Sequence, residues 1–454
     1  MSNSIYTLLI VESPVLARLI QNVAPPSVFV LATGGYCWKP EYDPERNSLK
    51  AVASPSKADF RKELGEQARW AGNIVVATDT DPSGDFIAWC LSRFLKSPMV
   101  VKRGKIRHIS KSGIIQMLSE TTELNETHLE ARLKNRHMIR TLWRRSPSLP
   151  EADLTAVTAV FSDRIPYLTF ADENGHIFKS SQPVSAAHDE WFPVSPEPSL
   201  DEFRNYKPLS TFDIIELTVQ HGIASTFSEA EQLLFNLFQH RLHLTNESLI
   251  SYPRTDANAF YSETWEALHT QFLASGKKAD FKPGFLRETA DQSIPHESVH
   301  PLKLKLDPDT AAGELDTQTA ELYRLIYRYT LRSLSMPEPL HQPFTNKLLG
   351  DAFFYPAEKM NECATESLRP VCTVSDFGKR LSQLDFISPS VFGSRINEWI
   401  DKEYISVSNQ CVLPGRKVLP IINRSKQYLK LLQKLKNASV QQLVPETVER
   451  ILTS

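Results

Sequence analysis

The segment LISYPRTDA (249–257) places Tyr252 two residues before Arg254. A tyrosine hydroxyl has an ordinary pKa of about 10, so it needs a nearby cation, metal ion or base to act as a nucleophile near neutral pH. Side chains two residues apart face the same side of an extended segment. The guanidinium of Arg254 would then stabilise a phenolate or clamp a phosphate. The alternative is structural: a half-buried strand tyrosine beside a solvated arginine.

Four acidic residues near the N-terminus are a second candidate. Glu12 follows the apolar run IYTLLIV, Asp79 ends GNIVVATD, Asp81 comes two residues later, and Asp85 begins the next helical pattern. Because the carboxyl ends of parallel strands lie side by side, these carboxylates should converge, and their repulsion calls for protons or a cation. Hard oxygen ligands suit Mg²⁺. The alternative is that Asp81 or Asp85 only caps the following helix.

The segment PHESVHP (295–301) brings His296, Glu297 and His300 close together. A histidine can hold or donate a proton near neutral pH, which would serve chemistry at a phosphate. Two alternatives remain, a polar turn histidine or a metal pair formed by His296 and His300. The i,i+4 spacing favours the metal pair, whereas Pro301 and the non-helical context count against it.

These residues need elements to position them, and the apolar patterns predict such elements. Buried strands are predicted at IYTLLIV, GNIVVATD and GKIRHIS (104–110), with helices between them, which indicates a small doubly wound α/β domain. Beyond about residue 115 the pattern is mainly helical. FSEAEQLLFNLFQHRL should be a helix with a capping box formed by Ser228 and Glu231, and LSTFDIIELTVQHG a helix capped by Ser210 or Thr211 and stopped by Gly222.

The composition sets the wider limits. With 454 residues the chain should form two to four domains. Its 41% apolar and 23% charged residues are typical of soluble proteins, and we expect a cytoplasmic protein because neither a membrane-spanning run nor a signal-peptide pattern occurs. Five scattered cysteines contain no C-x-x-C pair, so no zinc site is expected. The net charge of −2 neither indicates nor excludes a nucleic-acid partner.

Taken in order, these segments resemble type IA DNA topoisomerases. LLIVESPVLARLI and VVATDTDPSGDFIAW are similar to the two acidic signatures of the family's Toprim domain, and SLISYPRTDA is similar to the segment around its catalytic tyrosine. IPHESVHPL resembles the family's histidine motif. ELYRLIYRYTLRSLSMP and SPSVFGSRINEWIDKEYISVSNQCVLP resemble later family segments. The resemblance therefore spans nearly the whole chain.

This resemblance implies a multidomain fold, α/β plus mainly α, in which an N-terminal doubly wound Toprim sheet is followed by a toroidal core. The implied domains are Toprim at 1–120, a helical DNA-binding domain at 121–170 and 376–454, a β-rich arch at 171–207 and 338–375, and a helical domain at 208–337 carrying the catalytic tyrosine.

The resemblance also implies an activity, which is ATP-independent cleavage, passage and religation of single-stranded or negatively supercoiled DNA by a monomeric enzyme. Tyr252 would form a 5′-phosphotyrosine, Arg254 would stabilise that phosphate, Glu12 would serve the leaving 3′ oxygen, and His296 would assist at the DNA backbone. Mg²⁺ would be held by Glu12, Asp79, Asp81 and Asp85, with no zinc and no nucleotide cofactor. Further DNA contacts are expected from Arg18, Arg144, Arg145 and Arg328.

The sequence departs from the family at informative positions. Ser83 stands at the third acidic position, and Ser13 and Leu16 stand where a lysine is expected to contact the scissile phosphate. Two alternatives therefore stay open beside an active topoisomerase. One is a relative that binds single-stranded DNA or a partner protein without cleaving, and the other is a Toprim nuclease that uses only the acidic cluster.

Overall fold

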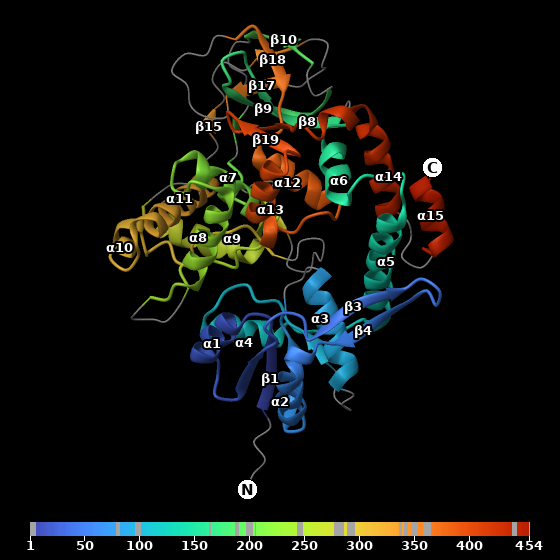
Figure 1. Ribbon diagram of the computed structural model, residues 1–454. Helices are drawn as coiled ribbons and strands as arrows, with labels where there is room; N and C mark the ends of the chain where they lie inside the picture. Colours follow the sequence, from blue (N-terminus) through green and yellow to red (C-terminus); the bar gives the residue numbers. More distant parts are fainter. Residues whose placement is uncertain are drawn as a thin grey trace.

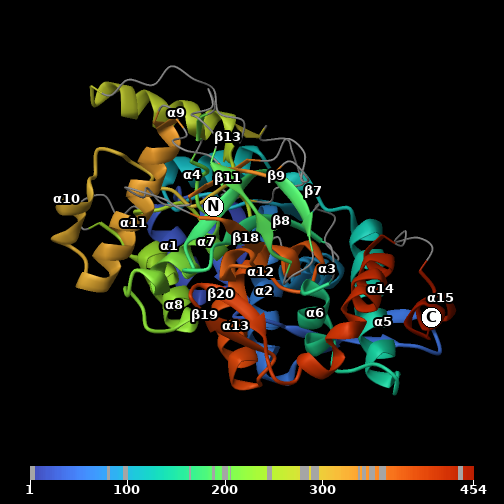
Figure 2. The ribbon, with the colours of Figure 1, turned by 90° about the horizontal axis from the view of Figure 1, so that it is seen from above.

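The computed structural model describes residues 6–78, 82–95, 101–162, 165–186, 190–196, 203–204, 206–242, 248–276, 286–287, 296–335, 338–339, 344–346, 353–356, 365–437 and 443–453. One β-sheet lies at the bottom of Figure 1 and a second lies at the top, with helices between them. The view from above shows α9, α10 and α11 on one side of the molecule and α5, α14 and α15 on the other (Figure 2).

The N-terminal sheet has the strand order β2-β1-β5-β6-β7. Its strands are β1 (Tyr6–Val11), β2 (Val28–Ala32), β5 (Ala71–Val76), β6 (Val101–Arg103) and β7 (Thr122–Glu123). The first four are parallel and β7 is antiparallel. The helices are α1 (Pro14–Val23), α2 (Ala58–Ala68), α3 (Pro82–Leu95) and α4 (Lys111–Ser119), and a hairpin, β3 (Trp38–Asp43) and β4 (Ser48–Ala53), extends from this part of the chain.

Alternating residues of β1 enter two different cores, as the period of a strand requires. Leu9 and Val11 pack with residues of α1 and α4. Leu8 and Ile10 pack with residues of α2 and α3 on the opposite face. Helices therefore cover both faces of the parallel sheet, which confirms the predicted doubly wound arrangement.

The predicted third strand over 104–110 is wrong. The strand is β6, and the chain leaves the sheet after the amide of Gly104 donates to the carbonyl of Val76 at 3.0 Å. Ile106 and Ile109, whose apolar character suggested a strand, are indeed buried. They are buried in a loop, because the backbone there bonds to a distant segment of the chain instead of to β5.

The tyrosine segment belongs to a group of helices that we term the tyrosine lobe (α7–α11 and the described segments between them). These helices are α7 (Thr211–Gln220), α8 (Phe227–Gln239), α9 (Ser262–Ala274), α10 (Pro308–Ala312) and α11 (Thr317–Leu334). Ser210 caps α7 in a capping box with Asp213, and Gly222 follows with a φ of +68°, so both boundary predictions are confirmed.

The predicted cap of α8 is wrong. Thr226, not Ser228, accepts the amide of Glu229, at 3.1 Å. The helix starts two residues earlier because Phe227 is buried as its first residue. Glu231 instead accepts the amide of Ser394 at 3.1 Å and so joins α8 to the next group of helices.

A second group of helices packs against the tyrosine lobe. It consists of α5 (Glu126–Arg145), α6 (Ala152–Val160), α12 (Val374–Gln383), α13 (Phe392–Asp401), α14 (Ser425–Asn437) and α15 (Pro445–Thr453). The hairpin of β19 (Ile405–Ser408) and β20 (Cys411–Pro414) follows α13.

The second sheet has the order β10-β18-β8-β9-β17-β16-β11. Its strands are β8 (Ile165–Ala171), β9 (Ile177–Ala186), β10 (Phe192–Pro193), β11 (Ser195–Pro196), β16 (Phe344–Thr345), β17 (Phe353–Pro356) and β18 (Ser367–Pro370). A core rich in phenylalanine holds it together, with Phe170 and Phe354 edge-on at 4.9 Å. Within the described residues, no helix is both long and apolar enough to cross a membrane.

Candidate active site

The carboxyl edge of the N-terminal sheet presents Glu12. Ile10 pairs with Val76, and the amide of Ala77 donates to the carbonyl of Ile10 at 2.8 Å, so the ends of β1 and β5 are neighbours. Glu12 is half-buried at this edge, and its carbonyl accepts the amide of Gly34 at 2.8 Å. Asp79 and Asp81, the two predicted metal ligands that follow β5, lie outside the described residues.

Asp85 stands in the first turn of α3, but cations already surround it. Its carboxylate pairs with Arg103 at 3.2 Å and also with Arg132. Arg103 donates to the hydroxyl of Thr78 at 2.6 Å, so the same guanidinium bridges the end of β5 and the start of α3. A metal ion would have to displace these arginines, which makes Asp85 a structural partner in this arrangement. Its role as a metal ligand stays a prediction.

Ser83, at the position where the resemblance implies an acid, accepts a hydrogen bond from the hydroxyl of Tyr36 at 2.9 Å. The ring of Tyr36 lies edge-on to Phe86 in α3, with the centroids 5.7 Å apart. The position therefore holds the loop after β2 against the start of α3. A neutral hydroxyl supplies no charge to the acidic edge.

Tyr252 meets this edge from the tyrosine lobe. Its side chain is 5% exposed and packs edge-on against Phe238 at 5.4 Å, while the ring of His296 lies 4.7 Å away on a tilted approach. The amide of Tyr252 donates to the carbonyl of Arg107 at 2.8 Å, which fixes the segment against the loop that follows β6.

One small cavity, about 10 Å³ in volume, lies at this meeting point. Its lining residues come from both sides of the contact: Leu16, Ala77, Thr78, Lys105, Ile106, Tyr252 and His296. The structure thus brings Tyr252 and His296 together, as the sequence indicated, and places them at the carboxyl edge of the sheet. The space holds no more than about one water molecule, so the contact is closed.

Arg254 lies half-buried with its guanidinium 5.1 Å from the centre of the Phe235 ring of α8. The role of Arg254 as a phosphate partner stays a prediction. The cation–π contact positions a charge that a polyanion could attract.

Glu297 and His300, the other members of the histidine segment, have local structural contacts. Glu297 accepts the amide of Tyr261 and the hydroxyl of Thr264, both at 3.0 Å, and so holds the start of α9. The Nε2 atom of His300 lies 3.5 Å from the Glu297 carboxylate. No metal-binding group of three or more His, Cys, Asp or Glu side chains occurs within the described residues, which exclude Asp79 and Asp81.

The four arginines predicted to bind DNA are all exposed. Arg18 lies on α1, Arg144 and Arg145 end α5, and Arg328 lies on α11 with its guanidinium 5.9 Å from the ring of Tyr329. Their exposure leaves the side chains accessible to a polyanion, and the predicted contacts remain predictions.

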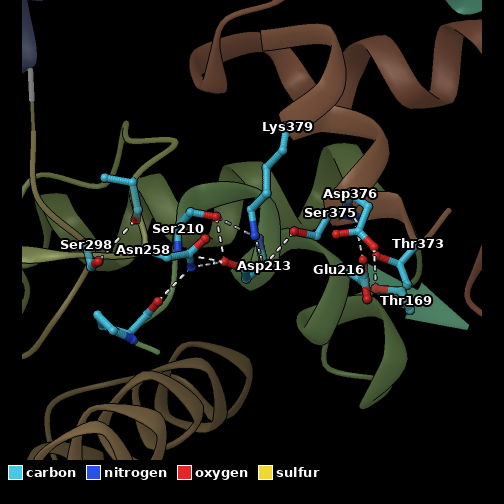
Figure 3. Close-up of polar contacts among 12 residues, drawn as sticks. Thr169, Ser210, Asp213, Glu216, Asn258, Ser298, Thr373, Ser375, Asp376 and Lys379 are labelled. Atoms are coloured by element: carbon cyan, nitrogen blue, oxygen red, sulfur yellow. Dashed lines mark hydrogen bonds and ion pairs between the residues drawn. The ribbon is translucent and has the colours of Figure 1, made fainter. Parts of the chain in front are cut away.

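A polar network that the sequence did not predict holds the tyrosine segment in place. Figure 3 shows Asp213 of α7 at its centre. One carboxylate oxygen accepts from Lys379 at 2.7 Å and Ser375 at 2.6 Å, both on α12, and the other accepts from Ser210 and from Asn258 at 2.5 Å. Asn258 comes six residues after Tyr252, so this carboxylate joins the tyrosine segment to α7 and α12.

Electrostatics differ between the two acids of α7. Although burial opposes ionisation, Lys379 and the hydrogen bonds of the network hold the pKa of Asp213 well below its ordinary value. Burial raises the pKa of Glu216 to about 7, although its carboxylate accepts the amide of Ser375. Asp213 is therefore the charged anchor of the network, and Glu216 is the member that titrates near neutrality.

Glu216 should make stability fall as the pH rises. Its ordinary pKa is 4.5 and its folded value is about 7, so its contribution is complete below pH 4.5 and is lost as the pH rises through 7. We expect Glu216→Gln to be more stable than wild type at pH 8 by about 2 kcal/mol, with little difference near pH 5. Urea unfolding between pH 5 and 8 measures this.

The control for that experiment is Glu266→Gln, which removes an exposed carboxyl from α9 and should leave the pH profile unchanged. A Glu216→Gln profile parallel to that of wild type would contradict the assignment. Gln220 donates to Glu216 at 2.9 Å and can turn its amide oxygen toward the new side chain.

No protein-family model matches the chain. The sequence is 23% identical over 386 residues to DNA topoisomerase 1 of Zymomonas mobilis, a match that covers 72% of this chain and 30% of that protein. It is 21% identical over 427 residues to DNA topoisomerase 1 of Mycoplasmoides gallisepticum, covering 73% and 59%, and 22% identical over 503 residues to that of Campylobacter jejuni, covering 90% and 71%. The matches thus span less than two thirds of the first two relatives.

The fold is similar to that of full-length topoisomerase I from Thermotoga maritima. The two structures share a TM-score of 0.63 at 17% sequence identity, and the similarity covers 98% of this chain and 89% of the other. This similarity establishes a shared fold, and the sequence matches carry the same name. The resemblance inferred from the motifs is confirmed: the chain is similar in sequence to proteins named DNA topoisomerase 1 and similar in fold to topoisomerase I.

Proposed function

We propose that this protein is a DNA topoisomerase of type IA character, in which Tyr252 cleaves one DNA strand and holds its 5′ end. The observation that carries the proposal is the cavity where Tyr252 and His296 meet the carboxyl edge of the N-terminal sheet. The carboxyl edge of the sheet at this cavity is the edge that presents Glu12 at the end of β1. That juxtaposition suits a covalent phosphodiester exchange.

In this scheme the phenolic oxygen of Tyr252 attacks phosphorus, the new O–P bond forms, and the bond from phosphorus to the 3′ oxygen breaks. The phenol proton passes to His296, whose ring lies against the tyrosine, and Glu12 donates a proton to the departing 3′ oxygen. Religation reverses each transfer. The phosphotyrosine conserves the energy of the broken bond, so no nucleotide is consumed.

Strand entry requires the closed contact to open. Tyr252 is 5% exposed and its cavity is far smaller than a nucleotide. The tyrosine lobe must therefore move away from the sheet edge to admit a single strand, and again to let a second strand pass. We propose single-stranded or negatively supercoiled DNA as the substrate, because only such DNA exposes an unpaired strand to this site.

Magnesium is the cation that we propose for the acidic edge, which we identify with a Toprim domain. Glu12 is half-buried there, and carboxylate oxygens are the donors that Mg²⁺ prefers. Glu12 with Asp79 and Asp81 would hold the ion, whereas Asp85 fits less well because two arginines already pair with it. When bound, Mg²⁺ neutralises the charge that the acids and the DNA phosphates share.

A labelled single-stranded oligonucleotide tests the chemistry. After denaturation, protein should carry covalent DNA that retains a 3′ label and loses a 5′ label, because the tyrosine holds the 5′ end. Adducts carrying the 5′ label would reverse the assigned polarity. Cleavage without any adduct would favour a Toprim nuclease instead.

Removing the metal should separate cleavage from strand passage. With excess EDTA we expect relaxation of a supercoiled plasmid to stop while adducts with the oligonucleotide still form, because the ion is needed for religation and strand movement. Gel assays with and without added Mg²⁺ measure both. Full relaxation in EDTA would contradict the assigned need for Mg²⁺.

A second candidate function is binding of single-stranded DNA without cleavage. The buried apolar side chain of Leu16 in the cavity and the neutral Ser83 favour it, since both stand where charged residues are implied. Salt-sensitive binding of single strands, with neither adduct nor relaxation, would support this candidate over the first.

A further inference from the structure

Lys105 shares the cavity of Tyr252 and His296, although no sequence pattern marks it. It lies in the loop after β6, which contacts the tyrosine lobe. Its side chain is half-buried. Of the cationic residues in the described part of the chain, it alone contributes to the lining of this cavity. The cavity thus has one lysine and the tyrosine of the proposed reaction in the same lining.

The two arginines on either side of Lys105 have other partners. Arg103 bonds to Thr78 and Asp85, and Arg107 pairs with Glu120 at 2.7 Å while its guanidinium lies 5.0 Å from the ring of Tyr261. Both arginines thus have contacts directed to other groups. Lys105, between them in sequence, is the one that reaches the lining of the cavity.

Helix α1 supplies no cation to the cavity. Its contribution is the buried apolar side chain of Leu16. Ser13 is occupied as the cap of α1, where its hydroxyl accepts the amide of Leu16 at 3.3 Å. The positive charge that a phosphate would meet here therefore comes from the opposite side of β5, across the sheet edge.

The backbone holds Lys105 at a fixed place. On one side Gly104 donates to Val76 at 3.0 Å, and a Cβ at this glycine would overlap the sulfur of Met117 and lie 3.0 Å from a methyl group of Val75. On the other side the carbonyl of Arg107 accepts the amide of Tyr252 at 2.8 Å. The segment is thus anchored to the sheet and to the tyrosine within four residues.

We propose that Lys105 is a catalytic residue that contacts the phosphate attacked by Tyr252. This inference rests on the proposed topoisomerase function and names a further residue for it. The ammonium group stays protonated throughout and bonds to a non-bridging phosphate oxygen, where negative charge grows as the tyrosine oxygen joins phosphorus and the 3′ oxygen leaves. The same charge favours the phenolate form of the nucleophile.

The test compares Lys105→Met with Lys105→Arg and with Lys111→Met, which removes the same charge from an exposed position six residues away. We expect the rate of oligonucleotide cleavage to fall about 100-fold in Lys105→Met. Lys105→Arg should recover most of this loss, and Lys111→Met should cleave as wild type does. Thermal unfolding of all three variants checks that the fold is retained.

Binding gives a readout that does not depend on cleavage. In a Tyr252→Phe background, Lys105→Met should lower the slope of log affinity for a single strand against log salt by about 0.7, the value for one phosphate contact. Lys111→Met serves as the control for non-specific loss of charge. If the wild-type protein never cleaves DNA but Lys105→Met still lowers the salt slope, the topoisomerase function is refuted and the contact between Lys105 and a phosphate is retained.

Three results would overturn the proposal. One is that Lys105→Met cleaves as fast as wild type. A second is a salt slope that does not differ between Lys105→Met and Lys111→Met. Cleavage that is lost in Lys105→Met but not recovered in Lys105→Arg, with an unchanged salt slope, would likewise assign Lys105 to the packing of the cavity.

Discussion

Tyr252→Phe should abolish covalent adduct formation and reduce plasmid relaxation by at least about 10⁴-fold, because the variant lacks the only oxygen that forms the proposed phosphotyrosine. The fold should survive, since the phenylalanine ring can keep the contacts with Phe238 and His296. A time course of relaxation and a denaturing gel for adducts measure the effect. Nicking that persists in Tyr252→Phe would point to a nuclease that uses the acidic edge alone.

Tyr323→Phe is the matched control. Tyr323 is a buried tyrosine of the same lobe, and its hydroxyl donates to the carbonyl of Leu306 at 2.8 Å. Removing this hydroxyl should cost about 1 kcal/mol of stability and leave relaxation intact. A similar loss of activity in both variants would show that the effect of Tyr252→Phe is one of folding and not of chemistry.

Gly393→Ala should strongly destabilise the fold. Gly393 lies near the start of α13, where the helix crosses the first turn of α8. A Cβ there would overlap the carbonyl oxygen of Phe227 and lie 2.8 Å from its carbonyl carbon and 2.9 Å from the Cβ of Glu231. Because two of these atoms are backbone, no side-chain rotation relieves the overlap. We expect a loss of about 3 kcal/mol, measured by urea unfolding.

Gly65→Ala provides the opposite case. Gly65 lies inside α2 with nothing within 4 Å of an added Cβ. Alanine should therefore stabilise this helix by about 0.5–1 kcal/mol. If Gly393→Ala were as harmless as Gly65→Ala, the close approach of α13 to α8 would not be a feature of the folded protein.

Local patterns predicted those elements correctly whose formation depends on residues close in sequence. The apolar run before Glu12 forms β1, and Ser210 caps α7 with Asp213 as a short-range hydrogen-bond pattern requires. The predictions failed where distant partners competed. Residues 104–110 form a loop that bonds to the tyrosine segment instead of a strand. Glu231 accepts the amide of Ser394 instead of capping α8.

For the site, residue types and order singled out Tyr252 and His296, and the structure places their rings 4.7 Å apart. The places of other candidates did not follow from residue types and order. Asp85 is paired with two arginines, and Arg254 lies against Phe235. These partners lie on other elements of the chain, so a spacing rule within one element does not predict them.

The sequence by itself determined the doubly wound N-terminal sheet with Glu12 after its first strand, and it singled out Tyr252 as the candidate nucleophile, because strand period and residue type are local properties. Only the tertiary structure decided that Lys105 joins Tyr252 in one closed cavity, and that Asp213 ties the tyrosine segment to Lys379. Both results depend on how separate lobes pack against each other. That packing is set by the summed contacts of many buried residues and not by any one motif.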